Sequence, residues 1–351
     1  MHTKEDATLR LSVIVPVHNG GEDLGRCLQG LAQSSRPADE IIVVDDGSTD
    51  GSAALAAAAG ARVIALGAGP RGPAFARNRG VEAASGDLLI FIDADVVVHT
   101  DTLARMQKVF EESVDVAALF GSYDDHPPVR TATSLYKNLL HHYVHQHSGP
   151  EAGSFWAGCG AIRRSVFQAV GGFDERYRRP SIEDIDLGVR LRRGGLRILL
   201  CADIQATHLK HWTLGSLLRA DIFARAVPWT RLILREGKLP ADMNLTWRSR
   251  FSALLAWGFF WGVLAALMLM LLAPGWASTL ALAGGLAEAL LVGLNVDLLA
   301  FFYRRGGAVF ALQAAGLHTL YLLYSSLVFA MLWAQNKFLM KRGRARGQAI
   351  P

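Results

Sequence analysis

An Asp-x-Asp pair is the first feature of this sequence that could do chemistry. Asp93 and Asp95 directly follow the apolar run Leu88–Ile92, which is typical of a buried strand. Two carboxylates at such an edge can hold a hard divalent cation, Mg²⁺ or Mn²⁺, between themselves and a diphosphate. Because single Asp-x-Asp pairs are common, this prediction depends on the motifs that accompany it.

Two more polar clusters stand where apolar runs end. Pro16, His18 and Asn19 close the first run, and Asp46 lies in the Asp-Asp-Gly-Ser-Thr-Asp segment 45–50. A carboxylate there can accept a hydrogen bond from a nucleotide base or a ribose hydroxyl. The same segment is also a good turn and helix N-cap, so this alternative stays open.

Three later segments add cations, small residues and acids. Arg71 and Arg77 surround the start of a predicted helix, where cations can meet phosphate. The small residues of 158–160 allow a sugar or acceptor to approach the backbone closely. Glu183 and Asp184 begin another predicted helix, where a carboxylate can serve as general base or can simply complement the helix dipole.

Short apolar runs alternate with longer helical patterns, and this alternation must position the clusters. We expect strands over 11–17, 40–45, 62–66, 88–92, 116–121 and 197–201, and helices over 21–34, 51–59, 74–84, 100–113 and 182–193. The pattern predicts an α/β fold with a mostly parallel sheet covered by helices on both faces. Ligands bind beyond the carboxyl ends of the strands in such sheets, which is where the polar clusters begin.

The apolar surplus of the chain, which is 51% hydrophobic over 351 residues, lies in its last hundred residues. We expect a catalytic domain over 1–211, amphipathic interface helices over 212–247, a transmembrane region over 248–334 and a basic tail over 335–351. The apolar runs 251–272, 276–294 and 308–333 can each cross a bilayer. The positive-inside rule favours a hairpin but opposes a third crossing, which would export the tail, so two and three crossings both stay open.

Charge and cysteine usage indicate the compartment. The net charge is +5, but basic residues gather beside the apolar runs, which favours the anionic cytoplasmic leaflet over nucleic acid. The three cysteines are far apart, as expected of buried thiols in a reducing compartment. Residues 1–10 are polar, so no signal peptide is expected and the catalytic domain should be cytoplasmic. His141 and His145 have a spacing that can bind a metal, although a polar helix face is the alternative.

Taken in order, these motifs resemble glycosyltransferase family 2, the inverting enzymes of GT-A fold, over about residues 11–211, as in membrane-anchored bacterial members. The resemblance implies the following roles. The nucleotide would contact Pro16, His18, Asn19, Asp46, Arg71, Arg77 and Asp93; the metal would bind Asp93, Asp95 and His208; the base would be Asp184 or Glu183; and the acceptor would contact Gly158, Cys159 and Trp229.

The resemblance predicts a metal-dependent inverting transfer from a nucleotide-sugar, expected to be a UDP-sugar, to a lipid or lipid-linked hydroxyl at the inner membrane. Processive synthases carry Gln-x-x-Arg-Trp after the base, and the nearest match here is the segment 225–229, which ends in Trp229. Polyprenyl-phosphate sugar transferases need no base, so the Glu183-Asp184 pair favours a hydroxyl acceptor. A polyprenyl-phosphate transferase and a non-catalytic membrane scaffold are the two alternatives.

Overall fold

A computed structural model describes residues 8–67, 69–237 and 246–345. The chain divides into two compact units. Unit 1 runs to Arg130 and resumes over Asn138–His211, and unit 2 consists of Thr131–Lys137 and the chain from Trp212 onward. Residues 1–7 of the polar start, 238–245 of the predicted interface segment and 346–351 of the predicted basic tail lie outside the described residues.

Within the described residues, unit 1 is built on one mixed sheet of eight strands. These are β1 Leu11–Val17, β2 Glu40–Asp45, β3 Arg62–Ala65, β4 Leu88–Ile92, β5 Val96–Val98, β6 Val116–Tyr123, β7 Cys159–Arg163 and β8 Arg197–His208. Their order is β3-β2-β1-β4-β7-β6-β8-β5. The pairs within β3-β2-β1-β4 and the pair β6-β8 are parallel, whereas β7 and β5 run antiparallel to their neighbours.

The two antiparallel strands are the ones that the sequence pattern missed. Strand β5 has only three residues, and β7 begins Cys-Gly-Ala, which lacks the β-branched run that marks a strand. Strand β8 also extends beyond the expected end at residue 201, reaching His208. The chain therefore has the α/β fold that was predicted, with a mixed sheet in place of a largely parallel one.

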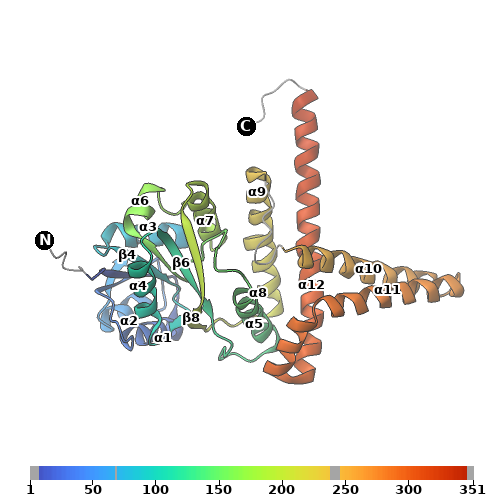
Figure 1. Cartoon of the computed structure of the whole chain (residues 1–351), viewed down its shortest axis with the longest axis horizontal. Helices are drawn as coiled ribbons and strands as arrows, with labels where there is room; N and C mark the ends of the chain where they lie inside the picture. The colour runs from blue at the N-terminus through green and yellow to red at the C-terminus, as the bar shows by residue number, and fades with distance from the viewer. Residues whose placement is uncertain (1–7, 68, 238–245, 346–351) are drawn as a thin grey trace. The chain divides into compact units, whose positions relative to one another are not determined.

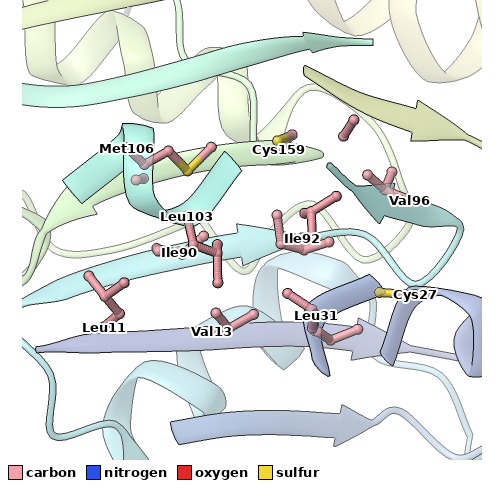
Figure 2. Packing of buried hydrophobic residues seen from close by; sticks show 14 of the residues in the cluster. Leu11, Val13, Cys27, Leu31, Ile90, Ile92, Val96, Leu103, Met106 and Cys159 are labelled. Carbon is pink, nitrogen blue, oxygen red and sulfur yellow. The ribbon is translucent and has the colours of Figure 1, made fainter. Parts of the chain in front are cut away.

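Helices cover both faces of the sheet because alternate strand residues point to opposite sides. The helices are α1 Gly21–Ala32, α2 Ser52–Ala58, α3 Pro73–Ala83, α4 Thr102–Glu112, α5 Ala132–Gln146, α6 Arg164–Ala169 and α7 Glu183–Arg193. Leu11 and Val13 of β1 pack in one core with Leu31 of α1 and Met106 of α4 (Figure 2). The intervening Ile14 faces α3: a Cβ added at Gly80 of α3 would lie 2.5 Å from its Cγ2.

Beyond residue 212, the described residues of unit 2 are mainly helical (Figure 1). It contains α8 Leu214–Arg219, the π-helix η1 Ala220–Ala226, α9 Val227–Glu236, α10 Trp247–Leu269, α11 Pro274–Leu294 and α12 Val296–Ala345. In the described part of the chain, three helices are long and apolar enough to cross a membrane: α10, α11 and residues 296–339 of α12. Helix α12 is interrupted at Gly307, whose φ of 78° is not helical.

Candidate active site

The polar clusters of the sequence meet at one edge of the sheet. In the parallel register, Val17 of β1 pairs with Asp45 of β2, and Ile14 pairs with Phe91 of β4, so the three strands end at one level. His18 Nδ1 donates a hydrogen bond to the Asp46 carbonyl at 3.0 Å, which joins the first two clusters directly. The carboxyl ends of β1, β2 and β4 therefore form the candidate site.

The first two clusters also brace their own loops. Asn19 adopts a left-handed φ of 53°, and its Oδ1 accepts the Thr49 N–H at 2.8 Å. The buried Asp46 carboxylate accepts the backbone N–H groups of Arg71 and Gly72 at 2.7 to 2.9 Å. Asp46 thus holds the loop that opens α3, and a contact between this carboxylate and the nucleotide stays a prediction. Arg71 itself is exposed, with its guanidinium over the ring of Phe75.

Arg77 has a different environment from the one expected of a phosphate ligand. Its side chain is 4% exposed, Nη1 donates to Glu183 Oε1 at 2.7 Å, and Nη2 donates to Asp93 Oδ1 at 2.7 Å. Both partners raise the pKa of the guanidinium against the cost of burial. Nη1 and Nη2 of Arg77 thus join the Asp-x-Asp loop to the start of α7, while its buried Nε has no hydrogen-bond partner among the described residues. The contact of Arg77 with the nucleotide stays a prediction.

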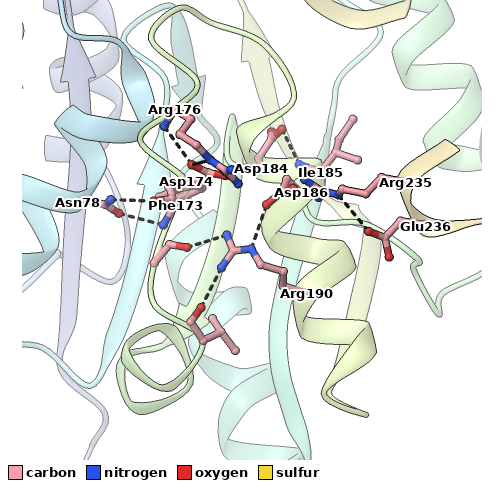
Figure 3. A network of polar contacts seen from close by, with 12 residues as sticks. Asn78, Phe173, Asp174, Arg176, Asp184, Ile185, Asp186, Arg190, Arg235 and Glu236 are labelled. Atoms are coloured by element: carbon pink, nitrogen blue, oxygen red, sulfur yellow. Dashed lines mark hydrogen bonds and ion pairs between the residues drawn. The ribbon is translucent and has the colours of Figure 1, made fainter. Parts of the chain in front are cut away.

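Its neighbours in α3 hold the loop that leads to α7. Asn78 exchanges two hydrogen bonds with the backbone of Phe173, at 2.9 and 3.0 Å. From α7, Arg190 donates to the carbonyls of Val170 and Gly172 and to Asp186 (Figure 3). The loop before Glu183-Asp184 is thus fixed from both helices, and the two acids are placed by these contacts.

The two acids at the start of α7 differ in how freely they can react. Glu183 is 4% exposed, and its oxygens accept from Arg77 and from the Ser181 N–H. Asp184 is half-buried and accepts the N–H groups of Ala157 and Ile185. Burial, and then the charge of Glu183, raise the pKa of Asp184 to about 7 against the pull of Arg77. Asp184 is therefore the acid of the pair that is suited to exchange a proton near neutral pH.

Asp95 and His208 form the candidate metal site. Their Oδ2 and Nε2 atoms lie 3.8 Å apart, within the ~4.2 Å that separates opposite ligands of one cation at bond lengths of roughly 2.1 Å. His208 Nδ1 donates to Asn138 Oδ1 at 2.6 Å, so its Nε2 presents a lone pair toward the Asp95 carboxylate. Lys210 Nζ also contacts Asp95, at 3.2 Å.

The donor set fits a cation that is completed by substrate. Across residues 8–67, 69–237 and 246–345, no group of three His, Cys, Asp or Glu side chains could hold a metal ion. Mg²⁺ is commonly bound by one or two carboxylates together with substrate phosphates, and Asp95 with His208 suits that arrangement. Asp93, which was also predicted to be a ligand, has one oxygen committed to Arg77.

The predicted acceptor residues fall in three different settings. A Cβ added at Gly158 would lie 2.8 Å from Tyr123 Oη and 3.3 Å from Asp93 Oδ2, so this glycine permits a close approach within the site. Cys159 is 2% exposed and belongs to the core, so its thiol offers almost no surface for the predicted contact with the acceptor. Trp229 lies in α9 of unit 2, and its contact with the acceptor stays a prediction.

Aromatic residues that sequence reasoning missed lie beside His208. Tyr123 stacks on its imidazole with ring centroids 4.3 Å apart and an interplanar angle of 9°, and Trp156 lies 4.6 Å from Tyr123. His145 packs edge-on against Trp156 at 4.4 Å, and burial lowers its pKa to about 3. His145 thus favours the neutral imidazole and forms part of an aromatic cluster with Trp156.

This sheet, with paired carboxylates at its edge and an acidic helix start beside it, is that of a glycosyltransferase of the GT-A class. Residues 12–171, somewhat less than half of the chain, match the family model "Glycosyl transferase family 2". The fold of the sheet and the match to the family model both confirm the resemblance drawn from the motifs.

Individual relatives cover parts of the chain. An uncharacterized glycosyltransferase of Escherichia coli, YibD, is 39% identical over 32% of this chain and 34% of its own length. The undecaprenyl-phosphate 4-deoxy-4-formamido-L-arabinose transferase of Serratia proteamaculans is 32% identical over 48% of this chain and 53% of its own length. The chain thus spans a third to a half of these relatives.

Among solved structures, the mannosyltransferase PcManGT from Pyrobaculum calidifontis, in complex with GDP-Man and Mn²⁺, is similar with a TM-score of 0.58. The likeness covers 93% of this chain and 88% of that one at 19% identity. At this identity the likeness concerns the fold, and it extends into the C-terminal helices.

Proposed function

We propose that this protein transfers a sugar, with inversion and with the help of a divalent metal, from a nucleotide-sugar to a hydroxyl of a lipid or lipid-linked acceptor. The observation that carries the proposal is the bridge made by Arg77. It joins Glu183, the neighbour of the candidate base, to Asp93 of the Asp-x-Asp loop through two contacts of 2.7 Å. The base and the diphosphate site are thereby held in one fixed arrangement, as a displacement reaction requires.

In the proposed reaction, Asp184 takes the proton of the acceptor hydroxyl as that oxygen forms a bond to the anomeric carbon. The bond from that carbon to the diphosphate oxygen breaks, and the nucleotide diphosphate leaves on the opposite face, which inverts the anomeric centre. A pKa raised to about 7 gives Asp184 the basicity to do this near neutral pH. Glu183 and Arg77 act as positioning residues.

The donor would lie along the sheet edge, with its nucleotide near Pro16, His18, Asn19 and Arg71. Asp95 and His208 would hold the metal, next to Asp93. When bound, a divalent cation there would neutralise charge on the diphosphate. The Pyrobaculum mannosyltransferase was solved with Mn²⁺, which is a reason to test Mn²⁺ first. A UDP-sugar is the proposed donor, and GDP- and dTDP-sugars belong in the same screen.

The membrane placement follows from charge. Arg248, Arg250, Arg304 and Arg305 flank the α10–α11 hairpin at its base, while its turn near residue 273 is uncharged. The positive-inside rule then places the base, and the catalytic domain with it, on the cytoplasmic side of the inner membrane. We propose that the hairpin anchors the enzyme there and that Trp229 and the interface helices present the acceptor.

A polyprenyl-phosphate glycosyltransferase is the second candidate, because relatives from Serratia and Yersinia are named undecaprenyl-phosphate transferases. A phosphate acceptor is already anionic and needs no base. The raised pKa of Asp184 favours the hydroxyl acceptor, because a hydroxyl must lose a proton during the transfer and Asp184 can accept that proton near neutral pH.

The test is transfer by the purified protein in lipid vesicles, with Mn²⁺ and each nucleotide-sugar, offering a membrane lipid extract and undecaprenyl phosphate separately. A hydroxyl acceptor predicts that Asp184→Asn lowers turnover by about 10²- to 10⁴-fold. Transfer to undecaprenyl phosphate that survives this substitution would establish the second candidate. Glu175→Gln removes a carboxylate from the Asn78 contacts and is the matched control. Donor binding without transfer to any acceptor would overturn both candidates.

A further inference from the structure

Helix α12 is poorly matched to a third membrane crossing. Beyond the break at Gly307, its uncharged run over 308–333 is about 39 Å long at ~1.5 Å per residue, whereas the hydrocarbon core is ~30 Å thick. A crossing would also carry Lys337 and the basic residues that follow it to the far side, against the positive-inside rule.

The middle of α12 contacts a charged cluster in unit 2. Tyr324 Oη donates to Asp221 Oδ2 at 2.7 Å. Asp221, in η1, is 4% exposed and accepts two hydrogen bonds from Lys137 Nζ at 2.7 and 2.9 Å, and a third from Arg225 at 3.2 Å. If α12 crossed the bilayer, Tyr324 would lie near its centre, and these three charges would lie there too. Charged side chains are costly at that depth and therefore rare there.

The contacts between α12 and the hairpin lie close to the base of the hairpin. Trp257 Nε1 of α10 donates to Ser326 Oγ at 2.9 Å, and Ala256 packs with Leu322. Trp257 is only ~15 Å along α10 from its first residue, Trp247. Figure 1 shows α12 running across the base of the α10–α11 hairpin, while the hairpin projects away from it.

One line along α12 is apolar and exposed. At ~100° per residue, five positions fall within ~40° of each other. They are Val309, Leu320, Leu327, Met331 and Phe338, with exposed fractions of 74%, 37%, 45%, 63% and 56%. Near the end of this stripe, Lys337 Nζ lies 3.9 Å from the ring centroid of Trp333, a pairing of residues that are enriched at membrane surfaces.

We infer that α12 lies in the plane of the cytoplasmic membrane surface, with this stripe in the acyl–headgroup boundary. Tyr324, which lies at the edge of the stripe at ~60° from Val309, then binds the charged cluster beside the helix at headgroup depth. The chain then crosses the membrane twice, through α10 and α11, and its basic tail stays beside the anionic leaflet that attracts it. The inference rests on the membrane placement proposed above for the hairpin.

Depth measurement along both helices tests it. Single cysteines at the five stripe positions, in a Cys201→Ser background because Cys27 and Cys159 are buried, are spin-labelled in vesicles of phosphatidylethanolamine and phosphatidylglycerol. The depth of each label is then obtained by comparing how strongly oxygen, which enters the bilayer, and a water-soluble nickel complex, which does not, enhance its spin relaxation. Labels at Phe251, Leu254 and Leu264 of α10 and at Leu271 in the turn that follows it, which are all exposed, form the control series.

We expect an even, shallow depth along α12 and a steep change of depth along α10. A profile along α12 that is deepest at Leu327 and shallow at both ends would overturn the inference while leaving the hairpin in place. A shallow, even profile along α10 would instead overturn the hairpin itself. In cells, alkaline phosphatase fused after residue 351 should be inactive and a fluorescent protein fused there should fluoresce; the reverse result would show a third crossing.

Discussion

Replacement of Glu183 by Gln should change the pH at which the enzyme becomes active, without removing its base. The carboxylate of Glu183 contributes, after burial, to raising the pKa of Asp184 from 3.8 to about 7, and Arg77 opposes it. Gln keeps the size of the side chain and an oxygen for the Arg77 hydrogen bond. It removes the charge that repels the Asp184 carboxylate, and it leaves Arg77 free to attract that carboxylate more strongly. Both effects lower the pKa.

The size of the shift follows from the interaction of two charges. Two like charges on neighbouring side chains ~7 Å apart interact by about 2 kcal/mol at an effective dielectric constant of ~20, which corresponds to roughly 1.5 pH units. A base works when it is deprotonated, so kcat/KM rises with pH through its pKa and then levels off. The midpoint of this rise should lie near 7 in the unaltered protein and fall to about 5.5 in Glu183→Gln.

The assay is kcat/KM for a fixed donor and acceptor from pH 5 to 9, at saturating Mn²⁺. Glu175→Gln, which removes a carboxylate bound to Arg79 and Asn78, should leave the midpoint unchanged. A loss of a hundredfold or more at every pH in Glu183→Gln would refute the reasoning and identify Glu183 as the base. An unchanged midpoint would show that Asp184 is not the group that titrates.

Three further predictions concern how the site is held. Asn138→Leu should weaken Mn²⁺ binding about 10- to 100-fold, because it removes the acceptor that orients His208, whereas Asn138→Asp should retain binding; calorimetric titration distinguishes them. Arg77→Met should destabilise the protein by about 3 to 5 kcal/mol, because Glu183 stays buried without a cation, and chemical denaturation followed by tryptophan fluorescence measures the loss. Gly80→Ala should cost about 1 to 3 kcal/mol in the same measurement, since its Cβ would press on β1.

The parts of the fold that could be predicted from sequence are those with a strong local signal. Strands β1, β2 and β4 are continuous apolar runs that end in polar clusters, and the register of a parallel sheet then requires those clusters to meet. Strands β5 and β7 carry little such signal, because one is short and the other contains a glycine where a Cβ would clash with the Trp156 carbonyl. Their antiparallel pairing depends on tertiary contacts alone.

In the candidate site, too, some features could be predicted from sequence and others depend on tertiary contacts. Residue types predicted which chemistry the carboxylates could do, but not which of them would be free to do it. Arg77 and Glu183 are both strongly charged residues in motifs, and only the structure shows that they neutralise each other in the core. Asn138 carries no sequence signal as a site residue, because its contact with His208 joins positions 70 residues apart in the chain.

These contacts divide the family motifs into two groups with different expected mutational signatures. Asp184, Asp95 and His208 present lone pairs or a titratable oxygen at the sheet edge, so changes there should lower turnover or metal affinity while the fold persists. Asn78 contacts the backbone of Phe173 and Gly80 lies against Ile14 of β1, so changes there should first lower stability, and activity should fall with the folded fraction. The motif Ala-Arg-Asn-x-Gly is therefore best understood as the support of the acidic helix start: its arginine fixes Glu183, its asparagine fixes the preceding loop, and its glycine lets α3 approach β1.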